Sequence, residues 1–133
     1  MMVRFFVQIE YDGTNYHGFQ KQPKTKKTIQ YEVEQALSKV ANHKVVTICS
    51  GRTDAGVHAV NQFIHFDTKS KRKVNSWIKG VNSYLPEDIS VKNFYKVNSN
   101  MHARFSAISR SYLYVITNSD TPPALGSSNC LWI

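Results

Sequence analysis

Apolar residues recur at every second position in several stretches of the chain. A period of two predicts β-strands, because alternate side chains of a strand face opposite sides of a sheet. The clearest stretch covers residues 3–11 and is followed by the turn pair Asp12-Gly13. The same pattern predicts further strands over residues 44–50, 60–68, 89–97 and 110–117.

Two other stretches carry apolar residues at the three- and four-residue spacing of helices. Thr28 precedes the first stretch as a candidate N-cap, and Glu32 follows in its first turn. The apolar positions of this helix are Ile29, Val33, Ala36, Leu37 and Val40. The second stretch runs from Trp77 to Leu85, and Pro86 closes it because proline cannot continue a helix.

The elements follow one another as strand, helix, strand, strand, helix, strand, and then one more strand. This order predicts an α+β fold of the ferredoxin-like βαββαβ type: an antiparallel sheet with helices on one face, plus an extra strand. We expect one domain over residues 1–117, which suits a chain of 133 residues. Residues 118–133 are expected to form an irregular tail or the start of a missing second domain.

The composition is basic, since 17 Lys and Arg against 9 Asp and Glu give a formal net charge of +8. A domain this basic often binds a polyanion such as nucleic acid. Lysines gather in stretches without acids, one of which holds Lys24, Lys26 and Lys27. Such stretches can together follow a phosphate backbone, although each alone is more often a solvated loop.

Cysteine and apolar content limit the other classes of protein. The only cysteines are Cys49 and Cys130, which argues against a disulfide framework and a structural zinc site. The five histidines show no metal-binding spacing. The apolar start is too short for a signal peptide, and no stretch approaches the roughly 20 residues of a membrane helix. We therefore expect a cytoplasmic protein with no membrane association.

One segment between two predicted strands could carry chemistry: GRTDAGVHA, residues 51–59. Its two glycines permit unusual dihedrals and close approach of a ligand to the backbone. Asp54 is the only acid between Glu34 and Asp67, and nearby Arg52 would favour the ionised carboxylate that a nucleophile needs. On this pattern alone, a turn whose aspartate caps local amides is the commoner explanation.

Three blocks, in this order along the chain, resemble tRNA pseudouridine synthases of the TruA type. EYDGTNYHGFQKQ (residues 10–22) is similar to the opening segment of that family, GRTDAGVHA to its catalytic stretch, and HARFSAISRSYLY (residues 102–114) to a later block. Together the blocks span nearly the whole chain, whereas any one of them would be a weak signal. Phe19 stands where many relatives carry tryptophan, and family members are longer, with a second, similar half.

The resemblance implies an isomerase that converts uridine to pseudouridine in the anticodon stem-loop of tRNA, at positions 38–40. It makes Asp54 the catalytic carboxylate, which in the family is thought to attack either the ribose C1′ or the uracil ring. Arg52 matches the arginine that pairs with this aspartate and helps displace the target base. Tyr112 matches the tyrosine that stacks on the uracil. No cofactor and no metal is implied.

The remaining expectations concern the RNA and the assembly. Arg104 and Arg110 lie in the same block as Tyr112 and are expected to contact RNA phosphate or to order the loop. Lys24, Lys26 and Lys27 are expected to bind RNA as well. The resemblance implies tRNA as the partner and a homodimer in the full-length protein.

Two other functions remain open from the sequence. A non-catalytic RNA-binding fragment is the main alternative, because RRM modules share the βαββαβ order. The third predicted strand, VNQFIHFD, lacks the basic-glycine-aromatic start of an RNP1 motif, which counts against it. A metal-dependent nuclease would need clustered carboxylates, and the nine acids here are scattered.

Overall fold

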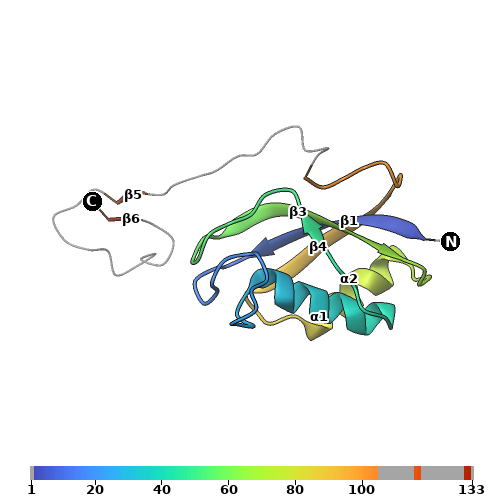
Figure 1. Ribbon diagram of the computed structural model, residues 1–133, viewed down its shortest axis with the longest axis horizontal. Helices are drawn as coiled ribbons and strands as arrows, with labels where there is room; N and C mark the ends of the chain where they lie inside the picture. Colours follow the sequence, from blue (N-terminus) through green and yellow to red (C-terminus); the bar gives the residue numbers. More distant parts are fainter. Residues whose placement is uncertain (1, 105–115, 118–130, 133) are drawn as a thin grey trace.

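A computed structural model gives the structure of the protein and describes residues 2–104, 116–117 and 131–132. A four-stranded antiparallel sheet carries two helices on one face (Figure 1). The elements of this body are β1 (Val3–Tyr11), α1 (Ile29–Ala41), β2 (Ile48–Cys49), β3 (Ala59–Thr68), α2 (Val74–Tyr84) and β4 (Ile89–Val97). The strand order β2-β3-β1-β4 confirms the predicted ferredoxin-like α+β fold.

The alternation predicted for β1 is the alternation observed. Phe5, Val7 and Ile9 are buried on the side of the helices, while the residues between them are only partly buried. Phe5 lies opposite Phe66 of β3, so the inward faces of the two central strands coincide. Register therefore follows from burial, because a shift of one residue would turn these side chains to the other face.

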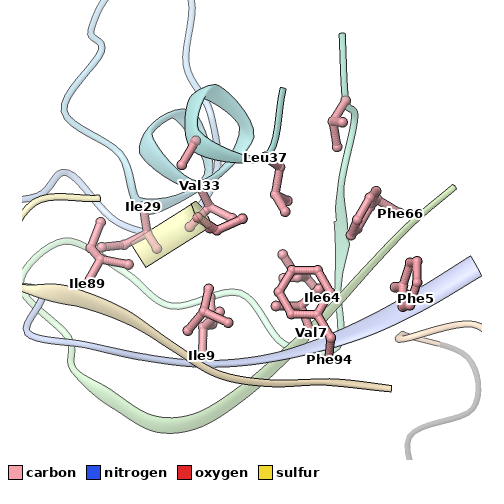
Figure 2. Packing of buried hydrophobic residues seen from close by; sticks show 14 of the residues in the cluster. Phe5, Val7, Ile9, Ile29, Val33, Leu37, Ile64, Phe66, Ile89 and Phe94 are labelled. Atoms are coloured by element: carbon pink, nitrogen blue, oxygen red, sulfur yellow. The ribbon is translucent and has the colours of Figure 1, made fainter. Parts of the chain in front are cut away.

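The helices complete the core with their apolar stripes. Ile29, Val33 and Leu37 of α1 point toward the sheet in Figure 2 and are fully buried. Thr28 caps α1 by accepting a hydrogen bond from the Tyr31 amide at 3.2 Å. Trp77 of α2 stacks on Phe94 of β4 with ring centroids 5.5 Å apart. Burying one large apolar side chain contributes about 1.5–3 kcal/mol to the stability of the fold.

The strand predicted over residues 44–50 is wrong in length, because β2 comprises only Ile48 and Cys49. Two amides just before it bind α1 instead of a neighbouring strand. Val45 donates to Ser38 Oγ at 2.9 Å, and Thr47 donates to Glu34 Oε2 at 2.8 Å. These side chains of α1 replace the ladder bonds that a longer strand would form.

Of the strand predicted over residues 110–117, the structure describes β5 (Ile116–Thr117), which pairs in parallel with β6 (Leu131–Trp132). The start of that stretch, with Arg110 and Tyr112, lies outside the described residues. In the part of the chain that the structure describes, no helix has the length and apolarity needed to span a bilayer.

Candidate active site

Residues 50–58 form the loop that joins β2 to β3, at the end of the sheet where β1 finishes. The side chain of Gln62 in β3 fixes the start of this loop. Its Oε1 accepts from Ser50 Oγ at 2.8 Å and from the Gly51 amide at 3.2 Å, and its Nε2 donates to Gly51 O. Gln62 is buried although it is polar, because the loop satisfies its amide group.

The middle of the loop is held by the segment that follows β1. The hydroxyl groups of Tyr11 and Thr53 are hydrogen-bonded at 2.7 Å, and the Phe19 amide donates to Thr53 O at 3.0 Å. Farther along, the Gly56 amide donates to Tyr16 O at 3.2 Å. The residues on both sides of Asp54 are thus bonded to the segment after β1.

Two glycines of that segment allow the close approach. Gly18 has φ +94°, and a Cβ there would lie 2.9 Å from Thr53 O. A Cβ at Gly13 would lie 2.0 Å from Val57 O, and the Gly13 amide donates to His58 Nδ1 at 2.9 Å. The glycines of the opening block are therefore needed for packing against the loop, because any side chain would meet backbone.

Asp54 lies in a turn that its own carbonyl closes by accepting from the Val57 amide at 3.2 Å. Gly56 supplies the positive φ of +78° that the turn requires. The Asp54 side chain is exposed. The loop thus presents a carboxylate to solvent on a backbone that is fixed on both sides.

Arg52 and Arg104 are exposed and line one open hollow of about 80 Å³. The other lining residues are Phe19, Gln20, Gln30, Thr47, Ile48 and Cys49. Burial raises the pKa of the Cys49 thiol, and the two guanidinium groups act in the opposite direction. Among the residues that the structure describes, no ion pair joins Arg52 to Asp54, so the expected pairing of these side chains is not observed.

A buried carboxylate supports the wall of this hollow. Glu34 of α1 pairs with Lys21 Nζ at 2.7 Å and accepts from both the amide and the hydroxyl of Thr47. Gln30 also donates to Thr47 O at 3.1 Å. A buried charge is tolerated when its hydrogen bonds are satisfied. Here the hydrogen bonds of Glu34 hold Thr47, the residue directly before β2, in place.

The expected RNA-binding residues are only partly described. Lys24, Lys26 and Lys27 are exposed on the segment between β1 and α1, the same segment that contacts the Asp54 loop. Lys26 Nζ lies 5.8 Å from the ring centroid of Tyr31. Tyr112 and Arg110 fall outside the described residues. Within the described ranges, no three His, Cys, Asp or Glu side chains are grouped so that they could hold a metal ion.

Sequence reasoning missed the residues that support the loop. Gln62 carried a usable signal, because it is a polar residue at an inward-facing position of an alternating strand. Tyr11 carried none, since its ring belongs to the apolar face of β1 and only its hydroxyl group reaches Thr53. Glu34 also carried no signal, because in the sequence it looks like any acidic residue on the exposed face of a helix.

Comparison with known proteins finds similar sequences over most of the chain. The family model described as tRNA pseudouridine synthase matches residues 7–106. A tRNA pseudouridine synthase A of Alcanivorax borkumensis is 50% identical over 131 residues, 98% of this chain and 49% of the relative. The enzyme of that name from Buchnera aphidicola subsp. Schizaphis graminum is 57% identical over 115 residues, 86% of this chain and 43% of the relative. The chain spans about half the length of the curated relatives it matches.

Proposed function

Because the chain belongs to the tRNA pseudouridine synthase family, we propose that it carries the catalytic carboxylate, Asp54, for converting uridine to pseudouridine in tRNA. In this reaction the C1′–N1 bond breaks, the base turns, and C5 bonds to C1′. One proton leaves C5 and one is gained at N1, so the change is an isomerisation without oxidation or reduction. A carboxylate that can add to the nucleoside and leave again satisfies this chemistry.

The observation that carries the proposal is the exposed side chain of Asp54 on a fixed loop. The target uridine has to leave its stack to meet this side chain, which costs a few kcal/mol. A rigid loop helps, because a nucleophile held in position need not be ordered during the reaction. Asp54 is bracketed by the hydrogen bonds of Thr53 and Gly56 to the segment after β1, which supports this role.

We assign the substrate contacts to the arginines and to one tyrosine. Arg52 lies two residues from Asp54 and lines the hollow, where its planar cation can occupy the space that the flipped base leaves. Arg104 lines the same hollow, which supports a role in binding phosphate. Stacking of Tyr112 on the uracil would return about 1–3 kcal/mol, and Arg110 is assigned to RNA binding with it.

The wider assignments follow from the family. We propose that the target uridines lie in the anticodon stem-loop, at positions 38–40, and that the full-length protein is a cytoplasmic homodimer. Residues 1–117 form the catalytic N-terminal domain in this proposal, and residues 118–133 are an irregular tail or the start of a second domain. Exposed Lys24, Lys26 and Lys27 supply charge for the RNA backbone beside the Asp54 loop.

The test is the release of tritium from tRNA labelled at uracil C5. Asp54→Asn removes the nucleophile but keeps the size of the side chain, so we expect release to fall by more than about 1000-fold. Binding of tRNA should change by less than about twofold, since the amide contributes no new clash. Glu87→Gln, at another exposed acid, is the matched control and should leave release unchanged. Persistent release from the Asp54 variant contradicts the assignment.

The same assay on the 133-residue chain distinguishes catalysis from the alternative of a non-catalytic RNA-binding fragment. That alternative is favoured by one observation, the coverage of about half of each relative. Binding of tRNA without tritium release would support it. Release by this chain alone would show that the Asp54 loop and its surroundings suffice.

A further inference from the structure

After β4 the chain turns back across the face of the sheet that carries no helix. Figure 1 draws this segment in orange, on the side away from α1 and α2. The return begins with the Met101 amide donating to Asn98 O at 3.0 Å. Because the strand order is β4-β1-β3-β2, the segment passes over β1 and β3 before it reaches β2.

Arg4 of β1 holds the first part of this crossing. Its Nη1 donates to Met101 O at 2.7 Å, while Nε and Nη2 donate to the Asp67 carboxylate at 2.8 and 3.0 Å. Asp67 of β3 lies directly opposite Arg4 in the sheet. Two parallel bonds to one carboxylate fix the plane of the guanidinium, so the remaining donor has a defined direction.

His65 of β3 holds the next part. The Ala103 amide donates to His65 Nδ1 at 2.9 Å, and both residues are buried. The imidazole stacks on Phe6 at 6.0 Å and meets the ring of His102 edge-on at 4.6 Å between centroids. Because Nδ1 accepts a hydrogen bond, the ring is neutral and carries its proton on Nε2.

Arg104 follows directly after this anchor. Its amide donates to His102 Nδ1 at 3.2 Å, and its side chain lines the hollow with Arg52 and Cys49. Ile48 of β2 lies opposite His65, so the hollow is one strand away from the anchor, about 4.8 Å. The segment that crosses the sheet thus ends at Arg104, whose guanidinium group lies at the hollow beside Arg52.

We propose that Arg4, Asp67 and His65 are positioning residues that hold residues 101–104 across the sheet and so keep Arg104 at the hollow beside Arg52. We call these contacts the crossing latch. The proposal rests on the proposed function in one respect, that the hollow belongs to the site that binds the target RNA. The latch acts on Arg104 through the backbone and touches no substrate itself.

Matched variants separate the hydrogen bond from the bulk of the ring. His65→Leu removes the acceptor for the Ala103 amide, whereas His65→Asn places an oxygen near the former Nδ1. Arg4→Lys is a second variant that keeps the charge facing Asp67 but cannot also reach Met101 O in the same geometry. His43→Leu is the control, because His43 bonds Thr68 away from the crossing segment.

Two measurements report on the latch without catalysis, on the 133-residue chain. Hydrogen exchange at the Ala103 amide should become faster in His65→Leu and in Arg4→Lys, and return toward the parent rate in His65→Asn. In a Cys130→Ser background, the pH dependence of Cys49 alkylation reports the cations around that thiol. Displacing Arg104 should move this titration to higher pH, because a nearby guanidinium favours the thiolate.

The third measurement is tritium release by the full-length protein. His65→Leu should lower kcat by about 10- to 100-fold through misplacement of Arg104, with a smaller change in KM. Arg104→Met should lower kcat similarly, and combining it with His65→Leu should add nothing further, because both changes remove one function. His65→Asn should recover most of the activity.

If the losses of kcat in Arg104→Met and His65→Leu multiply when the two changes are combined, the proposal is overturned. It is also overturned if Ala103 exchange and the Cys49 titration are unchanged in both His65→Leu and Arg4→Lys. Lower thermal stability with normal kcat would reduce the latch to a purely structural role. A parent protein that releases no tritium contradicts the proposed function instead, while exchange and alkylation still decide whether the latch positions Arg104.

Discussion

Asp54 and Glu34 are carboxylates with opposite surroundings. Glu34 is buried and bound by Lys21 and by two groups of Thr47, so its oxygens serve the fold. The Asp54 side chain is exposed, and in the described part of the chain it forms no side-chain hydrogen bond or ion pair. A nucleophile needs an oxygen that is accessible to substrate, and of these two only Asp54 has one.

His65 gives a prediction for the dependence of stability on pH. Burial, Arg4 and His102 lower the pKa of His65 to about 4, from a usual 6.5, and Asp67 acts weakly in the opposite direction. The unfolded chain therefore binds a proton more readily than the folded one between these values. The contribution of this histidine is complete above pH 6.5 and is lost as the pH falls toward 4.

The measurement is the free energy of unfolding by urea at several pH values for the parent chain and for His65→Asn. Asparagine does not titrate, so the parent should lose stability relative to the variant as the pH falls from 6.5 to 4. Asp67 and Asp12, whose pKa values are lowered by hydrogen bonds to Arg4 and Thr14, contribute to acid unfolding in both proteins. A constant difference across this range would contradict a buried, neutral His65.

At the scale of elements, the Asp54 loop depends on the segment after β1 for its shape. Gly18 and Gly56 both have positive φ, but only Gly18 is packed against backbone. Gly18→Ala should destabilise the protein by about 3 kcal/mol, since strain and a contact with Thr53 O add together. Gly56→Ala has no atom within 4 Å of the new Cβ and should cost only about 1–2 kcal/mol.

Thermal unfolding of the two glycine variants checks this difference. Gly56→Ala is the matched control, because it introduces the same methyl group at a similar φ in open space. Tritium release should fall more in the Gly18 variant, since movement of Thr53 displaces the neighbouring Asp54. Equal losses of stability would mean that the two segments adapt to each other and do not clamp the loop.

The elements that the sequence predicted are those with a local cause. β1, β3, β4, α1 and α2 each bury one face, and this leaves a period in the order of apolar residues. The short β2 has a distant cause, because Ser38 and Glu34 of α1 take the amides before it. The latch is more distant still: Arg4 and Met101 are separated by 97 positions, and no periodicity marks such a pair.

The candidate site divides in the same way. Asp54 and Arg52 could be named as candidates because they stand in a short contiguous motif. The convergence of Arg52 and Arg104 on one hollow could not be predicted, since the segment after β4 has to pass over β1 and β3 to bring them together. The resemblance to a family pointed to Arg52 and Arg104 separately. Only the fold shows that the two arginines line the same hollow.

At the scale of the whole molecule, the chain has a formal net charge of +8, and exposed basic residues lie at both ends of the sheet. Lys24, Lys26 and Lys27 lie on the segment that contacts the Asp54 loop, while Lys71, Arg72 and Lys73 precede α2. β3 runs from the first end to the second over ten residues, about 30 Å. Charge removal at the two ends therefore distinguishes a local RNA contact from an effect of total charge.

Replacing Lys24, Lys26 and Lys27 with glutamine should weaken tRNA binding and flatten its dependence on salt. Each lost phosphate contact lowers the slope of log K against log salt by about one, so the triple variant can lose up to about three. Titrations from low to moderate salt measure this slope. The triple glutamine variant at positions 71–73 has the same net charge and is the control. If the two variants flatten the slope equally, total charge explains the binding, and the segment after β1 has no special place on the RNA. If only the first does, phosphate is bound beside Asp54, where a flipped uridine would enter.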